Sequence, residues 1–138
     1  MQRQKHILVV EDDALARGIV GRRFARLGWR VSEATSDEGA LETLAAAAGD
    51  IDVVVTERMP LAFNGFDLAR RIRALQGPAA ATPVVVLSGL DRPSDIAAVL
   101  ASGANGFVSK PFDLGDLESE VARVMVLRDE ADPKAARP

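Results

Sequence analysis

The sequence predicts an α/β fold in which a five-stranded parallel sheet is covered by helices on both faces. Short unbroken runs of β-branched residues, typical of strands buried on both faces, alternate with segments of helical periodicity. Five strands and five helices follow one another in strict alternation, which requires right-handed crossovers between parallel strands. The segment 29–34 instead alternates polar and apolar residues, which is typical of an edge strand. The expected strands are residues 7–10, 29–34, 53–55, 84–87 and 106–109.

The expected helices begin at residues that can cap them and most end at a glycine. Asp13 precedes the first helix, Ser36 can cap the second and Asp113 the fifth. Asn64 opens the third helix, and the fourth begins at Pro93-Ser94. The stop signals are Gly28, Gly49, Gly77 and Gly103. In the first helix, the apolar face is expected to consist of Leu15, Ile19, Val20, Phe24 and Leu27.

Length and composition indicate one folded domain. The chain has 138 residues, of which 48% are hydrophobic and 27% charged, so it can bury a core. We expect residues 1–128 to form this domain and residues 129–138, rich in Ala, Pro and charge, to be a flexible tail.

Charge and residue usage exclude several classes of function. The net charge of -3 gives no electrostatic reason to expect direct nucleic-acid binding. The absence of cysteine excludes disulfides and thiolate chemistry. No apolar run approaches the roughly 18 residues of a membrane span, and the first six residues do not form a signal peptide. A cytoplasmic, non-membrane protein is therefore expected.

Polar residues follow four of the expected strands. Glu11 and Asp12 follow the first strand, Glu57 the third, Ser88 the fourth and Lys110 the fifth. Because the carboxyl ends of parallel strands share one edge, these side chains are expected to converge. Grouped carboxylates repel one another unless a cation lies among them, and oxygen ligands favour Mg²⁺ over Zn²⁺.

Each of these signals has an ordinary structural explanation when it is taken alone. An acidic pair after a strand is often a solvated turn or a helix cap, and we interpret Asp13 as a cap. Ser88-Gly89 is typical of a turn, and Lys110-Pro111 of a loop. The occurrence of all of them at the ends of four strands is what favours a functional site.

The same residues lie in motifs of a known family. The motifs are Ile-Leu-Val-Val-Glu-Asp-Asp at 7–13, Met59-Pro60 with Gly65, Leu-Ser-Gly at 87–89 and Phe-Val-Ser-Lys-Pro-Phe at 107–112. With them, the chain resembles the receiver domain of bacterial two-component response regulators, in a stand-alone form similar to chemotaxis receivers, from about residue 6 to 128. The resemblance implies a flavodoxin-like (βα)5 doubly wound sandwich with strand order 2-1-3-4-5. It also implies a cis peptide bond between Lys110 and Pro111.

The resemblance further implies a magnesium site. In the family, two acidic residues after the first strand, the phosphate-accepting aspartate after the third, and a backbone carbonyl two residues further on hold Mg²⁺. On this chain these positions are Glu11, Asp12, Glu57 and Met59, with Asp12 as the more direct ligand of the acidic pair.

Three further roles come from the resemblance. Ser88 corresponds to the hydroxyl residue that follows the phosphoryl group, and Lys110 to the lysine that forms an ion pair with it. Phe107 occupies the position of the aromatic side chain that changes rotamer on activation. Ser88 and Phe107 are thus the expected switch residues.

The acceptor position departs from the family pattern, which is Asp-x-x-Met-Pro with a glycine eight residues after the aspartate. Counting back from Met59-Pro60 reaches Thr56, whereas counting from Asp52 along the strand or back from Gly65 reaches Glu57. We favour Glu57, because two anchors agree and a shift inside a loop is well tolerated. In either register, no aspartate occupies the acceptor position.

A glutamate at this position leaves two hypotheses within the family. In the first, the chain is a non-enzymatic binding module that signals through protein contacts, because Glu57 is one methylene too long for in-line attack and reaches toward Ser88 and Lys110. Magnesium would then bind only weakly. In the second, the receiver still accepts a phosphoryl group from a histidine kinase at residue 57.

Other classes have less support. A flavin or nucleotide enzyme of the same architecture needs a phosphate cradle after the first strand, where Glu11-Asp12-Asp13 stands instead. A hydrolase with paired carboxylates lacks an additional base or nucleophile.

The expected partners are a sensor histidine kinase or phosphotransfer protein and a downstream effector protein. The resemblance implies docking on the fourth helix, last strand and fifth helix. An alternative is the first helix, where a basic face could meet an acidic partner or simply be solvated; its residues are Arg17, Arg22, Arg23 and Arg26.

Overall fold

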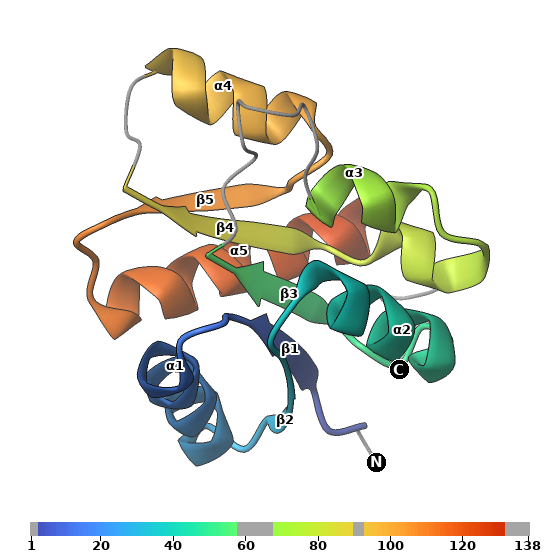
Figure 1. The fold of residues 1–138 in the computed structure, drawn as a ribbon, viewed down its shortest axis with the longest axis horizontal. Helices are drawn as coiled ribbons and strands as arrows, with labels where there is room; N and C mark the ends of the chain where they lie inside the picture. Colours follow the sequence, from blue (N-terminus) through green and yellow to red (C-terminus); the bar gives the residue numbers. More distant parts are fainter. Residues whose placement is uncertain (1–2, 58–67, 90–92, 132–138) are drawn as a thin grey trace.

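The structure, a computed structural model, describes residues 3–57, 68–89 and 93–131, and its centre is a parallel sheet (Figure 1). The five strands lie in the order β2-β1-β3-β4-β5, and every pair of neighbours is parallel. The fold class and the strand order implied by the family resemblance are therefore confirmed. The strands are β1 (His6–Val10), β2 (Arg30–Ala34), β3 (Val53–Thr56), β4 (Val84–Ser88) and β5 (Gly106–Ser109).

The helices cover both faces of this sheet (Figure 1). One core lies between the sheet and α2, α3 and α4, and includes Val54, Leu44 and Ile72. The other lies between the sheet and α1 and α5, and includes Val55 and Phe24. The unbroken apolar strands are explained by this arrangement, because both sides of each inner strand are buried. The helices are α1 (Ala14–Arg26), α2 (Asp37–Ala47), α3 (Leu68–Arg73), α4 (Pro93–Ala101) and α5 (Leu114–Ala131), with a 3₁₀ helix η1 (Gly77–Ala81) after α3.

The expected caps position the helices after the strands. Asp13 accepts a hydrogen bond from the Ala16 N–H at 2.8 Å, and Ser36 accepts one from the Gly39 N–H at 3.0 Å. Asp113 accepts from the Asp116 N–H at 2.7 Å in front of α5. Gly28, with φ of 90°, has the left-handed conformation expected after α1. Asn64, the expected start of the third helix, lies outside the described residues.

The expected apolar face of α1 is wrong in part. Val20 and Phe24 are buried, but Leu15 is 69% exposed, Ile19 43% and Leu27 51%. At about 100° per residue, Leu15 lies about 140° around the helix from Val20, on the side away from the sheet. Leu27 follows the last helical residue, Arg26, and is exposed at the helix end.

Two further elements differ from the sequence expectation. The 3₁₀ helix η1 was not expected, and it follows an α3 that ends at Arg73. Helix α5 continues to Ala131, three residues beyond residue 128, so its last turn includes residues that we expected in the tail. Within the described ranges, no helix is long and apolar enough to cross a bilayer.

Candidate functional site

The polar residues singled out from the sequence follow the strands at one edge of the sheet. Val10, the last residue of β1, lies beside Thr56 at the end of β3, and Ser88 at the end of β4 lies beside Ser109 at the end of β5. The next residues along the chain are Glu11, Glu57 and Lys110. We call Glu11, Asp12, Glu57, Ser88 and Lys110 the carboxyl-edge site.

The backbone around this site is held by hydrogen bonds between neighbouring strands. The Glu57 N–H donates to the Val10 carbonyl at 3.4 Å, and the Lys110 N–H donates to the Ser88 carbonyl at 2.8 Å. The peptide bond between Lys110 and Pro111 is cis, as expected. These contacts bring the starts of the loops after β1, β3, β4 and β5 to the same edge.

The side chains of Glu57 and Lys110 form an ion pair between Glu57 Oε1 and Lys110 Nζ. The Glu57 side chain is 23% exposed and the Lys110 side chain 39%, so the pair is only partly shielded from water. Glu57 follows β3 and Lys110 follows β5, and β4 lies between these two strands. The pair therefore connects the ends of two strands that are not neighbours.

Glu11 is the buried carboxylate of the site. Its residue is 6% exposed, and Oε2 accepts a hydrogen bond from the Asp13 N–H at 2.8 Å. Oε1 is buried and has no hydrogen-bond partner within the described part of the chain. A buried carboxylate oxygen without a partner is costly, so this atom fits a role as ligand of a cation.

Arg17 supports Glu11 in a way that the sequence pattern did not reveal. Its Nη1 donates to the Glu11 carbonyl at 2.9 Å, and its Nε donates to Glu33 Oε1 at 2.8 Å. Arg17 thus connects α1, the loop after β1 and the edge strand β2. The contact with Glu33 depends on the pairing of β1 with β2, and local sequence spacing carries no signal for it.

The residues present fit a hard cation in part. Asp12 is exposed and follows Glu11, whose Oε1 is buried, while the carboxylate of Glu57 forms an ion pair with Lys110. Among the residues that the structure describes, no three acidic, His or Cys side chains come together as a metal site. Met59, expected to supply a carbonyl ligand, lies outside the described residues.

The space between Glu11 and Glu57 is small. A cavity of about 10 Å³ lies beside them, lined also by Val9, Val20 and Leu87. This volume is about the minimum that one water molecule needs.

Thr56, the other candidate for the acceptor position, has a different environment. Val53 and Val55 pack in the core beneath α1 and α5, and Val54 packs in the opposite core. Because side chains alternate along a strand, Thr56 points to the same face as Val54. Thr56 is 2% exposed and is the last residue of β3.

The two expected switch residues lie on β4 and β5. Ser88 is 2% exposed at the end of β4. Phe107 is half-buried and packs against the core beneath α2, α3 and α4. Phe107 lies in β5, three residues before Lys110 of the carboxyl-edge site.

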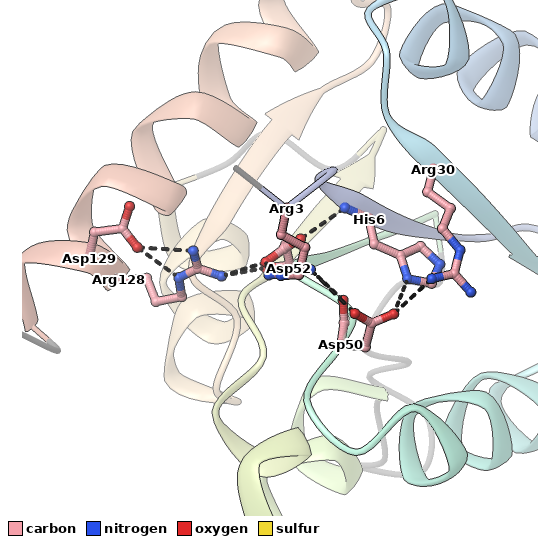
Figure 2. A network of polar contacts seen from close by, with 7 residues as sticks. All are labelled: Arg3, His6, Arg30, Asp50, Asp52, Arg128 and Asp129. Carbon is pink, nitrogen blue, oxygen red and sulfur yellow. Dashed lines mark hydrogen bonds and ion pairs between the residues drawn. The ribbon is translucent and has the colours of Figure 1, made fainter. Parts of the chain in front are cut away.

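The opposite edge of the sheet carries a polar network that sequence reasoning missed (Figure 2). Asp52, whose side chain is 3% exposed, accepts from the His6 N–H at 2.8 Å, from Arg3 at 2.5 Å and from Arg128 at 3.3 Å. Figure 2 shows Asp52 between these groups, which come from the N-terminal segment, β1 and α5. We call this set the amino-edge network; it consists of Arg3, His6, Arg30, Asp50, Asp52, Arg128 and Asp129.

Asp50 connects the network to the edge strand β2. It forms ion pairs with Arg30 at 3.0 Å and Arg3 at 3.4 Å, and contacts His6 Nδ1 at 3.2 Å. The hydrogen bond with His6, helped by the two arginine charges, holds the pKa of Asp50 below its usual value. A pocket of about 670 Å³ lies beside this network, lined by Arg3, Ile51, Asp52, Leu127 and Arg128 among others.

The structure thus defines a parallel α/β sandwich with acidic, hydroxyl and lysine side chains at the carboxyl edge of its sheet. Residues 7–122 match the family described as response regulator receiver domain. The chain belongs to this family: it is a receiver domain of two-component response regulators.

Relatives and solved structures agree with this assignment. The two-component response regulator ORR41 of Oryza sativa subsp. japonica is 34% identical over 108 residues, which are 76% of this chain and 82% of that protein. The probable transcriptional regulator ycf27 of Cyanidium caldarium is 29% identical over 124 residues. That match covers 90% of this chain but only 47% of the relative, so the chain spans about half of that protein.

Two structural neighbours have the same fold. The chemotaxis protein CheY4 of Vibrio cholerae has a TM-score of 0.76 and 27% identity, over 88% of this chain and 99% of that one. The receiver domain of sensor histidine kinase PA1611 from Pseudomonas aeruginosa has a TM-score of 0.73 and 24% identity, over 90% and 99% of the two chains. In that structure a magnesium ion is coordinated in the active site cleft.

Proposed function

We propose that this receiver signals through protein contacts without forming an acyl phosphate, because Glu57 occupies the acceptor position and is held by Lys110. The observation that carries the proposal is the ion pair between Glu57 Oε1 and Lys110 Nζ. In the family, Lys110 corresponds to the lysine that pairs with the bound phosphoryl group. Here a carboxylate of the protein takes that place.

The geometry favours Glu57 over Thr56 as the acceptor position. Glu57 lies beyond the end of β3 and reaches Lys110, whereas Thr56 is the last residue of the strand and is buried. The count from Asp52 and Gly65 leads to the same residue. The displacement of Met59-Pro60 by one residue is then a change within the following loop.

A glutamate at this position is a poor nucleophile for phosphoryl transfer. Attack requires the carboxylate oxygen, phosphorus and leaving oxygen to be in line, and a displacement of about 1 Å can cost on the order of a hundredfold in rate. The extra methylene of Glu57 moves its carboxylate toward Lys110. It carries one negative charge compared with nearly two for a phosphate, so it imitates the phosphorylated state only in part.

We further propose that Mg²⁺ binds weakly at the carboxyl-edge site. Glu11, Asp12, Glu57 and the Met59 carbonyl would hold it, and this assignment is supported by Oε1 of Glu11, which has no hydrogen-bond partner among the described residues. Bound there, the ion would neutralise negative charge on phosphoryl oxygens. Lys110 opposes its binding, because it already occupies the carboxylate of Glu57.

The proposed partners are a sensor histidine kinase or phosphotransfer protein and a downstream effector protein. The face formed by α4, β5 and α5 is the proposed docking surface, by its likeness to the family. The basic face of α1 is less suited as a whole, because Arg17 pairs with Glu33 and Arg23 with Glu118 at 2.7 Å. Arg22 and Arg26 are the exposed basic residues of that helix.

Intact-mass measurement tests the proposal. After incubation of the unmodified protein with Mg²⁺ and acetyl phosphate, we expect no mass increase of one phosphoryl group. A phosphoryl group located on Glu57 would replace the proposal by the second hypothesis, in which residue 57 still accepts phosphate from a histidine kinase.

A further inference from the structure

One side of the edge strand β5 is not paired with another strand in the described part of the chain, and helix α5 covers that side. β5 is the last strand of the sheet and pairs only with β4 in the described part of the chain. The Lys110 N–H points toward β4, where it donates to the Ser88 carbonyl. Since N–H groups alternate along a strand, the Phe107 N–H points to the free side, where an exposed edge is prone to pair with another chain.

Glu120 and Arg123 of α5 close this free side. Glu120 Oε2 accepts from the Phe107 N–H at 2.9 Å. Arg123 donates to both carboxylate oxygens of Glu120 at 2.8 Å, and its Nη2 also donates to the Asn105 carbonyl at 3.1 Å. We call these two residues the Glu120–Arg123 clamp; they bond the backbone on either side of Gly106, at Asn105 just before β5 and at Phe107 within it.

Gly106 makes room for this clamp. A Cβ atom at position 106 would lie 2.6 Å from Glu120 Oε2 and 3.0 Å from Val124 Cγ1. The first distance is too short for any side chain, so a residue larger than glycine would displace the carboxylate. The carboxylate of Glu120 can therefore reach the Phe107 N–H only because residue 106 has no side chain.

The charge on Glu120 supports the same arrangement. Its hydrogen bonds with Arg123 and, to a smaller degree, with the Phe107 N–H hold the pKa of Glu120 below its usual value, against the opposing effect of burial. The carboxylate is therefore ionised at neutral pH, where hydrogen bonds to a charged acceptor are the stronger kind.

We propose that Glu120 is a positioning residue, which ties the backbone of the switch residue Phe107 to α5 and so transmits the state of the carboxyl-edge site to that helix. The strand that the clamp holds continues from Phe107 to Lys110, whose side chain pairs with Glu57. A change in the Glu57–Lys110 pair thus acts on a strand that is bonded to α5. Only this transmission rests on the function proposed above; the hydrogen bond to Phe107 does not.

Amide hydrogen exchange measured by NMR on the full chain tests the clamp. In wild type, we expect the Phe107 amide to be protected although it faces the free side of β5. In Glu120→Ala, it should exchange about tenfold faster or more, which is the effect of losing one hydrogen bond to a charged group. Glu120→Gln keeps an acceptor oxygen and should lose less protection.

Glu118→Ala is the matched control, because Glu118 lies on the same helix but pairs with Arg23 of α1. It should leave the exchange of Phe107 unchanged. If Phe107 exchanges equally fast in wild type and in both Glu120 variants, the clamp is refuted. If Glu118→Ala accelerates Phe107 as much as Glu120→Ala does, the effect belongs to α5 as a whole and the proposal is also overturned.

Gly106 provides a test of mutual dependence. Gly106→Ala should accelerate Phe107 exchange in wild type but add little in the Glu120→Ala background, because the carboxylate that it displaces is already absent. If the effects of Gly106→Ala and Glu120→Ala on the exchange rate of the Phe107 amide are fully additive, the clamp is contradicted.

The transmission step has its own readout. Introduced into the wild-type protein, Glu57→Ala should shift the NMR resonances of α5 around Glu120. Introduced into the Glu120→Ala variant, the same substitution should not shift them. Shifts that persist without Glu120 would refute transmission. The intact-mass experiment on wild type tests the proposed function separately, so the two results can be told apart.

Discussion

Lys110 at the end of β5 forms an ion pair with Glu57 at the end of β3, across the intervening strand β4. In the register that we propose, a phosphate-accepting receiver would have an aspartate at position 57, and its lysine would be available to the phosphoryl group. In this chain the longer carboxylate satisfies the lysine within the protein itself.

The first prediction is that Lys110 and Mg²⁺ compete for Glu57. Lys110→Met should raise the affinity for Mg²⁺ up to about fivefold, because a partly exposed ion pair is worth at most about 1 kcal/mol. Asp12→Ala should lower the affinity. Calorimetry, or broadening of NMR signals by Mn²⁺, measures both effects.

Lys5→Met is the control for this experiment, because Lys5 lies over the Trp29 ring, 5.6 Å from its centroid, and outside the carboxyl-edge site. It should leave Mg²⁺ binding unchanged. Binding that does not respond to Asp12→Ala would show that the assigned ligands are wrong.

The second prediction concerns the amino-edge network (Figure 2). Asp52→Ala should lower the free energy of unfolding by about 2–3 kcal/mol, because a buried carboxylate that accepts from His6, Arg3 and Arg128 is lost. Asp50→Ala should cost less than Asp52→Ala, since Asp50 is 37% exposed and its ion pairs are screened. Urea denaturation of the two variants gives the comparison; equal losses would contradict it.

The third prediction is a pH dependence due to Glu120. Its pKa is lower in the folded protein than the usual 4.5, so its contribution to stability is fully present above about pH 4.5. That contribution is lost as the pH falls through the folded-state pKa. The stability difference between wild type and Glu120→Gln should therefore be larger at neutral pH than at about pH 3. A difference that stays constant over this range would show that Glu120 gains nothing from its charge.

The fold was predictable because its determinants are local in the sequence. The β-branched runs at 53–55 and 84–87 mark inner strands, and Asp13 and Ser36 cap helices through contacts three residues away. The exposure of Leu15 follows from the helix geometry once Val20 and Phe24 face the sheet, because Leu15 lies about 140° around α1 from Val20.

The residues of the carboxyl-edge site and one of its contacts were predictable. Parallel strands place Glu57 and Lys110 at one edge, and the family resemblance together with the longer glutamate side chain predicted that Glu57 reaches Lys110. The other contacts were not predicted. Arg17 forms hydrogen bonds with Glu11 and Glu33, and Glu120 forms one with the backbone of Phe107. These bonds join residues that are far apart in the sequence or lie on different elements. No spacing rule identifies such pairs.

The central claim, that the length of the side chain at residue 57 is what prevents phosphorylation, has one direct test. Glu57→Asp, Thr56→Asp and wild type are incubated with Mg²⁺ and acetyl phosphate, and their intact masses are measured. We expect that only Glu57→Asp gains a phosphoryl group, because shortening the side chain by one methylene restores in-line geometry beside the metal. Modification of Thr56→Asp alone, or of wild type at Glu57, would contradict it.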